Sequence, residues 1–327
     1  MKKIIYFTFV IAFSILIIGG CTNNQTEVED TPQSIEEVSD YEVPKVYASF
    51  YPIWDFAQRI GGERIDLELI IPAGADPHHF EISARGLADM ENADLIFLNG
   101  LEFEPWENDL RSIAQGNVIS LGEYARPLPF GDDHHSHGHD HNHDHDGEDN
   151  HEHGLMDPHV WLDPNRAIDM SSALLDALIS IAPSNENYYK ANFEELKDEL
   201  DELDRKYSAL KDIENKKPIV VSHNSYGYIS DTYGIEFYSI SGMSAEQEPS
   251  LRVLSNIIEL VREKNIEVIF FEELANEKVA QTIASETGAK TDVLYTIEGM
   301  TEEEIQSGMG YISKMNENLN KILEAIQ

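Results

Sequence analysis

The sequence predicts an α/β protein of two lobes, each a mostly parallel sheet covered by helices, joined by one long rigid helix. Two observations predict it. Short apolar runs alternate with amphipathic stretches from Val43 to residue 121, and the same alternation returns from Lys217 to the end of the chain. Between the two blocks, apolar residues recur at helical spacing. Alternating strand and helix patterns favour parallel sheets, because a parallel pair of strands needs a crossover that is usually a helix.

The first twenty residues predict an export signal. Two lysines precede an apolar run over residues 4–18, which is followed by Gly-Gly and Cys21. The run is shorter than the ~18–20 residues of a membrane-spanning helix, and its flanks are those of a signal peptide. We expect residues 1–20 to be cleaved and Cys21 to carry a lipid; an uncleaved anchor helix is the alternative. Residues 21–43 are polar and acidic, which predicts a flexible tether.

The composition excludes some classes of partner and of stabilisation. Cys21 is the only cysteine, so the exported chain can form no internal disulfide and its own core must hold it together. The formal net charge is −38, from 61 acidic and 23 basic residues. Such a charge makes nucleic acid an implausible partner and a cation a plausible one.

We assign the N-terminal lobe to residues 44–183. Its predicted strands are short apolar runs, and its predicted helices are amphipathic. The strands are expected at 45–51, 64–72, 94–100 and 117–121. The helices are expected at 54–62, 82–93 and 106–116.

A linking helix is predicted at residues 184–213. Apolar side chains recur there at alternating spacings of four and three, at Tyr189, Phe193, Leu196, Leu200, Leu203, Tyr207 and Leu210. This pattern predicts a continuous helix of about 28 residues and about 40 Å, packed as a strut along both lobes. A coiled coil between chains is the alternative, although the stretch covers only about three heptads.

The C-terminal lobe is assigned to residues 214–327. Its strands are expected at 217–223, 235–240, 266–272 and 289–295. Its helices are expected at 225–234, 249–265, 276–288 and from Thr301 onward. Gly234 and Gly288 follow two of these helices, as C-terminal caps do.

Four histidines lie outside a histidine-rich segment and occupy informative positions. His78 and His79 follow the strand at 64–72, and His223 ends the strand at 217–223. Ligand sites gather outside the carboxyl ends of parallel strands. His159 lies in DPHVWLDP, where the flanking Asp157 or Asp163 could accept the second ring N–H. We therefore expect these histidines to meet in one cleft as metal ligands.

Three neutral imidazoles favour zinc, because harder ions such as manganese prefer more oxygen ligands. The fourth ligand is less clear from the residues. Glu298 follows the last predicted strand and can reach the cleft, but Glu272, Glu273, Asp292 or water could also fill this position.

The histidine-rich segment is residues 132–153, where histidines alternate with acids and almost no residue is apolar. Such a segment cannot bury a core, so we expect a secondary, low-affinity metal loop that feeds the cleft. A passive acidic linker is the alternative. Its histidines are His134, His135, His137, His139, His141, His143, His145, His151 and His153.

Several strings, in this order, resemble the metal-specific (cluster A-I) solute-binding lipoproteins of ATP-binding cassette importers, in their zinc-uptake branch. The strings are DPHHFE, ADLIFLNGLEFEPW, the histidine-rich loop, DPHVWLDP, SHNSYGYISDTYGI and FFEELANEKVAQTIASETGAK. The likeness covers nearly all of residues 44–327. It implies two lobes bridged by one helix and a zinc site made by His78, His159, His223 and Glu298.

The resemblance also implies a function. The protein would be a monomer, anchored by its lipid at the extracytoplasmic face of the cell membrane, that captures Zn²⁺ and delivers it to the importer's permease. Uptake of manganese or iron is the alternative, but histidine at position 223 favours zinc. A lipid-anchored zinc hydrolase or an adhesin is a further alternative. We expect no enzyme, because the sequence contains neither HExxH nor a Gly-x-Ser-x-Gly elbow.

Overall fold

The computed structural model describes residues 43–130, 155–242, 249–273 and 277–327. The predicted signal peptide, the lipidation site Cys21, nearly all of the tether and the histidine-rich loop 132–153 lie outside the described residues. Within the described part, no helix is both long enough and apolar enough to cross a bilayer. The described residues belong to one compact unit, Glu42–Gln327.

A four-stranded parallel sheet forms the centre of the N-terminal lobe, in the order β2-β1-β3-β4. Its strands are β1 (Lys45–Ala48), β2 (Asp66–Leu69), β3 (Leu95–Leu98) and β4 (Asn117–Ser120). The two central strands are almost wholly buried, as an apolar strand between two layers of helix must be. All four strands were predicted, and each is shorter than its apolar run.

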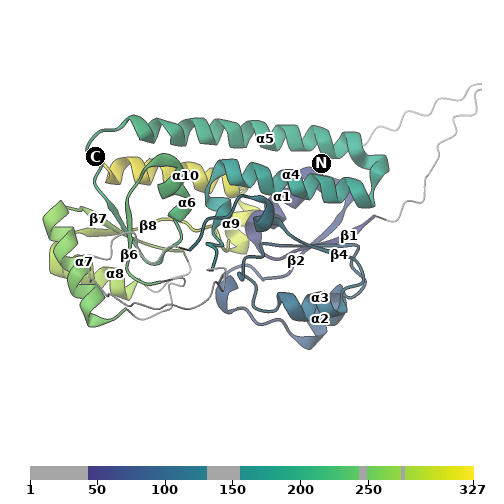
Figure 1. The fold of residues 1–327 in the computed structure, drawn as a ribbon, viewed down its shortest axis with the longest axis horizontal. Coiled ribbons are helices and arrows are strands. Elements are labelled where there is room, and N and C mark those ends of the chain that lie inside the picture. Colours follow the sequence, from purple (N-terminus) through teal and green to yellow (C-terminus); the bar gives the residue numbers. More distant parts are fainter. Residues whose placement is uncertain (1–42, 131–154, 243–248, 274–276) are drawn as a thin grey trace, which may run out of the picture. The chain divides into compact units, whose positions relative to one another are not determined.

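Helices cover both faces of this sheet (Figure 1). On one side lies α1, and on the other lie α2 and α3. Their bounds are α1 (Tyr51–Gly61), α2 (Ala84–Met90) and α3 (Glu107–Ile113). Pro52 in the first turn of α1 has the fixed φ that a helix start accepts. The Ser83 hydroxyl caps α2 by accepting the Gly86 N–H.

A fourth helix of this lobe, α4 (Pro164–Ile181), was not predicted. Asp163 caps it by accepting the Asn165 N–H, and Pro164 occupies its first turn. Met170, Leu174 and Leu178 are fully buried along one face. An Asp-Pro start followed by this spacing is a helix signal that was present in the sequence.

The linking helix, α5 (Glu186–Ser208), contacts α1 and α4 of the first lobe and α10 (Tyr311–Ala325) of the second. All seven apolar residues of its stripe are buried, so this stripe is used within the chain. The predicted strut is confirmed. The α-helix is shorter than about 28 residues, because the chain tightens into a 3-10 turn at Ala209–Asp212.

The C-terminal lobe repeats the architecture with a parallel sheet in the order β6-β5-β7-β8. Its strands are β5 (Ile219–Val221), β6 (Phe237–Ser239), β7 (Val268–Phe271) and β8 (Lys290–Val293). Its first helices are α6 (Gly227–Tyr233), α7 (Leu251–Lys264) and α8 (Lys278–Thr287). Gly234 and Gly288 are left-handed helix caps, as predicted.

The prediction of one final helix from Thr301 onward was wrong. The chain forms two helices there, α9 (Glu302–Gln306) and α10. Gly308 takes a φ of 81°, which a continuing helix does not allow, and a second glycine at position 310 precedes α10. The break leaves α10 free to pack against α5.

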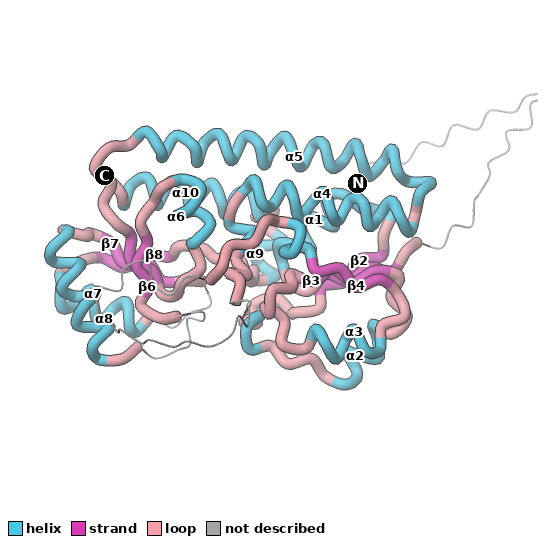
Figure 2. Tube along the Cα trace, in the orientation of Figure 1, coloured by secondary structure: helices cyan, strands magenta, loops and turns pink. Residues whose placement is uncertain are grey.

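Parallel strands bring their carboxyl ends to one edge of each sheet. Loops occupy the space between the two sheets, beneath α5 (Figure 2). The segments that follow β2, β5 and β8 carry His78, His223 and Glu298, respectively. This is the position at which ligand sites of parallel α/β sheets are found.

Candidate metal centre

His78 is held by a short 3-10 turn, Pro77–His79, after β2. The Asp76 carboxylate caps this turn by accepting the His78 N–H at 2.9 Å. The same carboxylate lies 3.0 Å from Nδ1 of His79. The His78 side chain is 11% exposed and the His79 side chain is 51% exposed, so only His78 faces the interior.

His159 lies in the stiff segment between Pro158 and the 3-10 turn Val160–Leu162, and it is fully buried. Asp157 Oδ1 accepts the His159 N–H at 3.0 Å and lies 2.7 Å from its Nδ1. The expectation that a flanking aspartate contacts the ring is therefore met by Asp157. Asp163 is not placed at the ring: it caps α4 and pairs with Arg166 at 2.6 Å.

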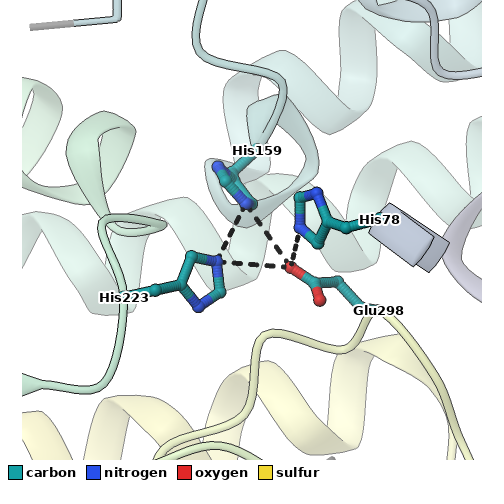
Figure 3. Close-up of side chains that lie close together, drawn as sticks. All are labelled: His78, His159, His223 and Glu298. Carbon is teal, nitrogen blue, oxygen red and sulfur yellow. Dashed lines mark hydrogen bonds and ion pairs between the residues drawn. The ribbon is translucent and has the colours of Figure 1, made fainter. Parts of the chain in front are cut away.

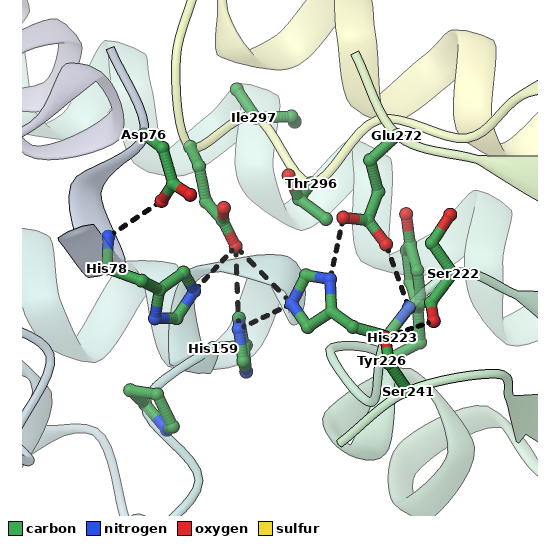
Figure 4. Close-up of polar contacts among 12 residues, drawn as sticks. Asp76, His78, His159, Ser222, His223, Tyr226, Ser241, Glu272, Thr296 and Ile297 are labelled. Atoms are coloured by element: carbon green, nitrogen blue, oxygen red, sulfur yellow. Dashed lines mark hydrogen bonds and ion pairs between the residues drawn. The ribbon is translucent and has the colours of Figure 1, made fainter. Parts of the chain in front are cut away.

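His223 lies two residues beyond the end of β5 and is 1% exposed. Glu272, just beyond β7, accepts the His223 N–H at 3.1 Å and lies 2.6 Å from Nδ1. Figure 4 shows Asp76 and Glu272 on opposite sides of the cluster, bonded to His78 and His223. A carboxylate on Nδ1 fixes the tautomer of His159 and of His223 and leaves Nε2 available to a metal.

Glu298 completes the cluster (Figure 3). Its Oε1 lies 3.4 Å from Nε2 of His78, 3.4 Å from Nε2 of His159 and 3.7 Å from Nε2 of His223. The Nε2 atoms of His159 and His223 are 3.1 Å apart. One potential ligand atom from each residue lies within 4.8 Å of all the others.

The three acids that could have competed with Glu298 have other roles in the structure. Glu272 contacts Nδ1 of His223, whereas the Nε2 atom of that ring faces the cluster. Glu273 accepts the backbone N–H groups of Thr296 and Ile297. Asp292 lies 3.2 Å from Nζ of Lys321 and is half exposed.

The charges of the cluster depend on one another. Burial would raise the pKa of Glu298, but the three imidazoles hold it well below its usual range. Burial would lower the pKa of His159, yet Asp157 and Glu298 raise it to about 9. Nε2 of His78 and Oε1 of Glu298 are buried and make no hydrogen bond. A cation at the centre would satisfy both atoms.

Sequence reasoning did not assign two residues that shape the site. Asp76 was not singled out, although an aspartate before Pro-His is a turn-capping signal. Glu272 was considered only as a ligand. Its contact with His223 joins positions 49 residues apart, and no local pattern predicts such a contact.

Comparison with known proteins gives consistent matches. The family model described as zinc-uptake complex component A, periplasmic, matches residues 46–325. The high-affinity zinc uptake system protein ZnuA of Bacillus subtilis is 34% identical over 328 residues, which covers 97% of this chain and 96% of that protein.

A second relative is the zinc-binding lipoprotein AdcA of Streptococcus pneumoniae, 33% identical over 284 residues. The match covers 85% of this chain and 54% of AdcA, so the chain spans about half the length of that relative. Among solved structures, the Zn(II)-bound ZnuA-like domain of the S. pneumoniae AdcA aligns with a TM-score of 0.71 and 29% identity. That alignment covers 87% of this chain and 99% of the domain.

Proposed function

The chain belongs to the family of zinc-uptake complex component A proteins, and from that premise we propose that it captures zinc with high affinity outside the cytoplasm and delivers it to the permease of an ATP-binding cassette importer. Zinc is the cargo of this protein rather than a resident cofactor. The bound ion would be held by Nε2 of His78, His159 and His223 and by Oε1 of Glu298.

The geometry of the cluster carries this proposal. In a tetrahedral zinc site with bonds of ~2.0–2.1 Å, neighbouring ligand atoms are roughly 3.3–3.4 Å apart. Four of the six separations among the proposed ligand atoms run from 3.1 to 3.7 Å, and all of them lie within 4.8 Å. The four side chains therefore converge on one point, with spacings close to those of a zinc site.

The ligand chemistry supports zinc over manganese or iron. Three imidazole nitrogens and one carboxylate oxygen are typical zinc ligands, whereas manganese prefers a site richer in oxygen. Four protein ligands also leave no position at which zinc could activate water. We therefore propose that the protein binds and releases zinc without catalysing a reaction.

Two further parts of the proposal, the lipid anchor and the role of the histidine-rich loop, rest on the sequence alone. A lipid on Cys21 would keep the protein, as a monomer, at the extracytoplasmic face of the cell membrane, close to the permease. The histidine-rich loop 132–153 would hold zinc weakly beside the cleft and raise its local concentration there.

The chain offers a matched pair of variants to test the site. The purified full-length protein is analysed for bound metals, and its tightest site is titrated with zinc and with manganese against a chelator of known affinity. His78→Ala should weaken the tightest zinc site by at least tenfold. His79→Ala removes the adjacent ring, which faces outward, and should leave that affinity within a few-fold. Equal losses in the two variants, or a preference for manganese, would refute the proposal.

A further inference from the structure

The backbone that leads into Glu298 adopts a conformation that its own residues disfavour. Ile297 has a φ of 59°, in the left-handed region. A β-branched side chain rarely adopts this region, because its Cβ substituents crowd the backbone. Such a conformation persists only where the surroundings impose it, and it is found most often at functional sites.

Side chains from three other segments restrain the backbone that leads into this conformation. The Glu273 carboxylate accepts the Thr296 N–H at 3.0 Å and the Ile297 N–H at 2.7 Å. Asn318 of α10 accepts the Tyr295 N–H at 2.8 Å and donates to the Tyr295 carbonyl at 2.7 Å. Trp161 donates its indole N–H to the Thr296 carbonyl at 2.7 Å. Five successive backbone groups, from the Tyr295 N–H to the Ile297 N–H, are thus each bonded by a side chain.

The Trp161 bond also joins the two lobes at the site. Trp161 lies two residues after His159 and packs against that ring, with centroids 5.4 Å apart. Thr296 lies two residues before Glu298. Trp161 is fully buried, and its carbonyl accepts the hydroxyl of Tyr311 in α10. The segments that carry one ligand from each lobe are therefore held in register by a buried hydrogen bond.

We propose that Glu273 and Trp161 are positioning residues that present a single oxygen of Glu298 to the three imidazoles, and that this restraint sets the preference of the site for a four-coordinate ion. The inference rests on the proposed function. A backbone held by these bonds keeps Oε1 at the centre of the cluster. A released backbone lets the carboxylate turn to offer both oxygens, or withdraw so that water enters.

Binding through both carboxylate oxygens raises the coordination number, and so does withdrawal of the carboxylate when more than one water takes its place. Zinc favours four ligands, whereas manganese favours six ligands rich in oxygen. Loss of the restraint should therefore weaken zinc binding. The ratio of zinc affinity to manganese affinity should fall. A residue that only stabilised the fold would weaken both ions alike, so the ratio of the two affinities separates the two roles.

The test uses full-length chains with Glu273→Gln and with Trp161→Phe. The glutamine retains one acceptor oxygen in place of two, and the phenylalanine retains an aromatic ring without the N–H. Each variant receives half an equivalent of cobalt(II), so that the tightest site fills first. Cobalt absorbs strongly in the visible region when four-coordinate and weakly when six-coordinate. Zinc and manganese affinities are then measured by competition.

A matched control is Asp94→Asn. The Asp94 carboxylate also accepts a backbone N–H, that of Lys45 at 2.8 Å, but it does so at the amino end of β1, away from the ligands. We expect Glu273→Gln and Trp161→Phe to lower the visible absorption per bound cobalt and to reduce the preference for zinc over manganese by about tenfold or more. Asp94→Asn should change neither quantity.

The outcomes separate this inference from the proposed function. A wild-type chain that binds no zinc tightly, or binds cobalt in six-coordinate form, would refute the proposed zinc site itself. If the wild type is four-coordinate and zinc-selective, unchanged cobalt spectra and unchanged affinity ratios in the two variants refute only the positioning role. Because the two substitutions lie in different lobes, a folding defect in one still leaves the other to decide.

Discussion

Zinc binding at neutral pH should release a proton from His159. The Asp157 and Glu298 carboxylates overcome the effect of burial and raise the pKa of this imidazole to about 9 in the metal-free protein. A ring with that pKa is neutral in only about one molecule in 100 at pH 7, and zinc needs the neutral ring. Proton competition at His159 should therefore weaken the apparent zinc affinity by ~100-fold at pH 7, or about tenfold per pH unit up to pH 9.

Isothermal titration calorimetry measures this release directly. At pH 7.5, zinc is titrated in two buffers that differ in ionisation enthalpy, and the difference between the heats counts the protons. We expect about one proton per zinc bound at the tightest site. The same titration at pH 9.5 should release less than half as many, because His159 is then mostly neutral.

The variant Asp157→Asn tests whether the Asp157 carboxylate causes the raised pKa of His159. The amide removes the charge that holds the proton, so the pKa of His159 falls and proton release at pH 7.5 decreases. Above about pH 9, where proton competition no longer contributes, zinc affinity should fall by roughly 10–100-fold, because the ring loses its charged orienting partner. The reasoning is refuted if wild type and variant release the same number of protons, or if the wild type releases none.

The raised pKa also links the stability of the metal-free protein to pH. The folded state holds this proton more tightly than the unfolded state, whose pKa is near ~6.5. The stability from the Asp157 contact is therefore complete below the unfolded pKa and is lost as pH rises through about 9. In Asp157→Asn, thermal denaturation should show a weaker dependence on pH in that window.

Three further predictions concern the fourth ligand, the loop and the linking helix. Glu298→Gln should weaken zinc binding by roughly 10–100-fold in a chelator competition; no loss there, together with a large loss in Glu272→Gln, would reassign the ligand. Deletion of residues 132–153 should lower the zinc stoichiometry to one per chain by elemental analysis and leave the tightest dissociation constant within a few-fold, and loss of tight binding would make the loop the site. Leu200→Ala should lower the free energy of unfolding by about 2–5 kcal/mol in urea denaturation, because it opens a cavity in the stripe of α5; an unchanged midpoint would show that this stripe does not stabilise the fold.

The fold was largely predictable because its signals are local. Apolar runs such as 94–100 and the spacing of the α5 stripe report burial directly, and the strands and the strut follow from them. The break between α9 and α10 was also marked, by Gly308 and Gly310, but the amphipathic pattern on both sides obscured it. Helix α4 was not predicted because its start signal, Asp163-Pro164, was overlooked. Tertiary context was not the reason.

From the residues alone, the site was predictable to the level of its histidines, and the family resemblance added Glu298. Few histidines lie outside the loop, so those at strand ends were conspicuous. The acidic ligand was harder to identify from the residues, because Glu272, Glu273 and Glu298 all follow strands of one lobe. Which of them faces the imidazoles depends on backbone direction, and a positive φ at Ile297 contributes to it without any signal in the residue type.

The packing of α5 has a mechanical consequence. An α-helix bends only if hydrogen bonds in its ladder lengthen or break, and this 23-residue helix is also fixed along its length by α1, α4 and α10. The two lobes are therefore joined by a stiff rod, and wide thermal separation of the lobes would strain it. We infer that a loaded copy loses its ion slowly when alone, because opening the cluster by moving the lobes apart would require this rod to bend.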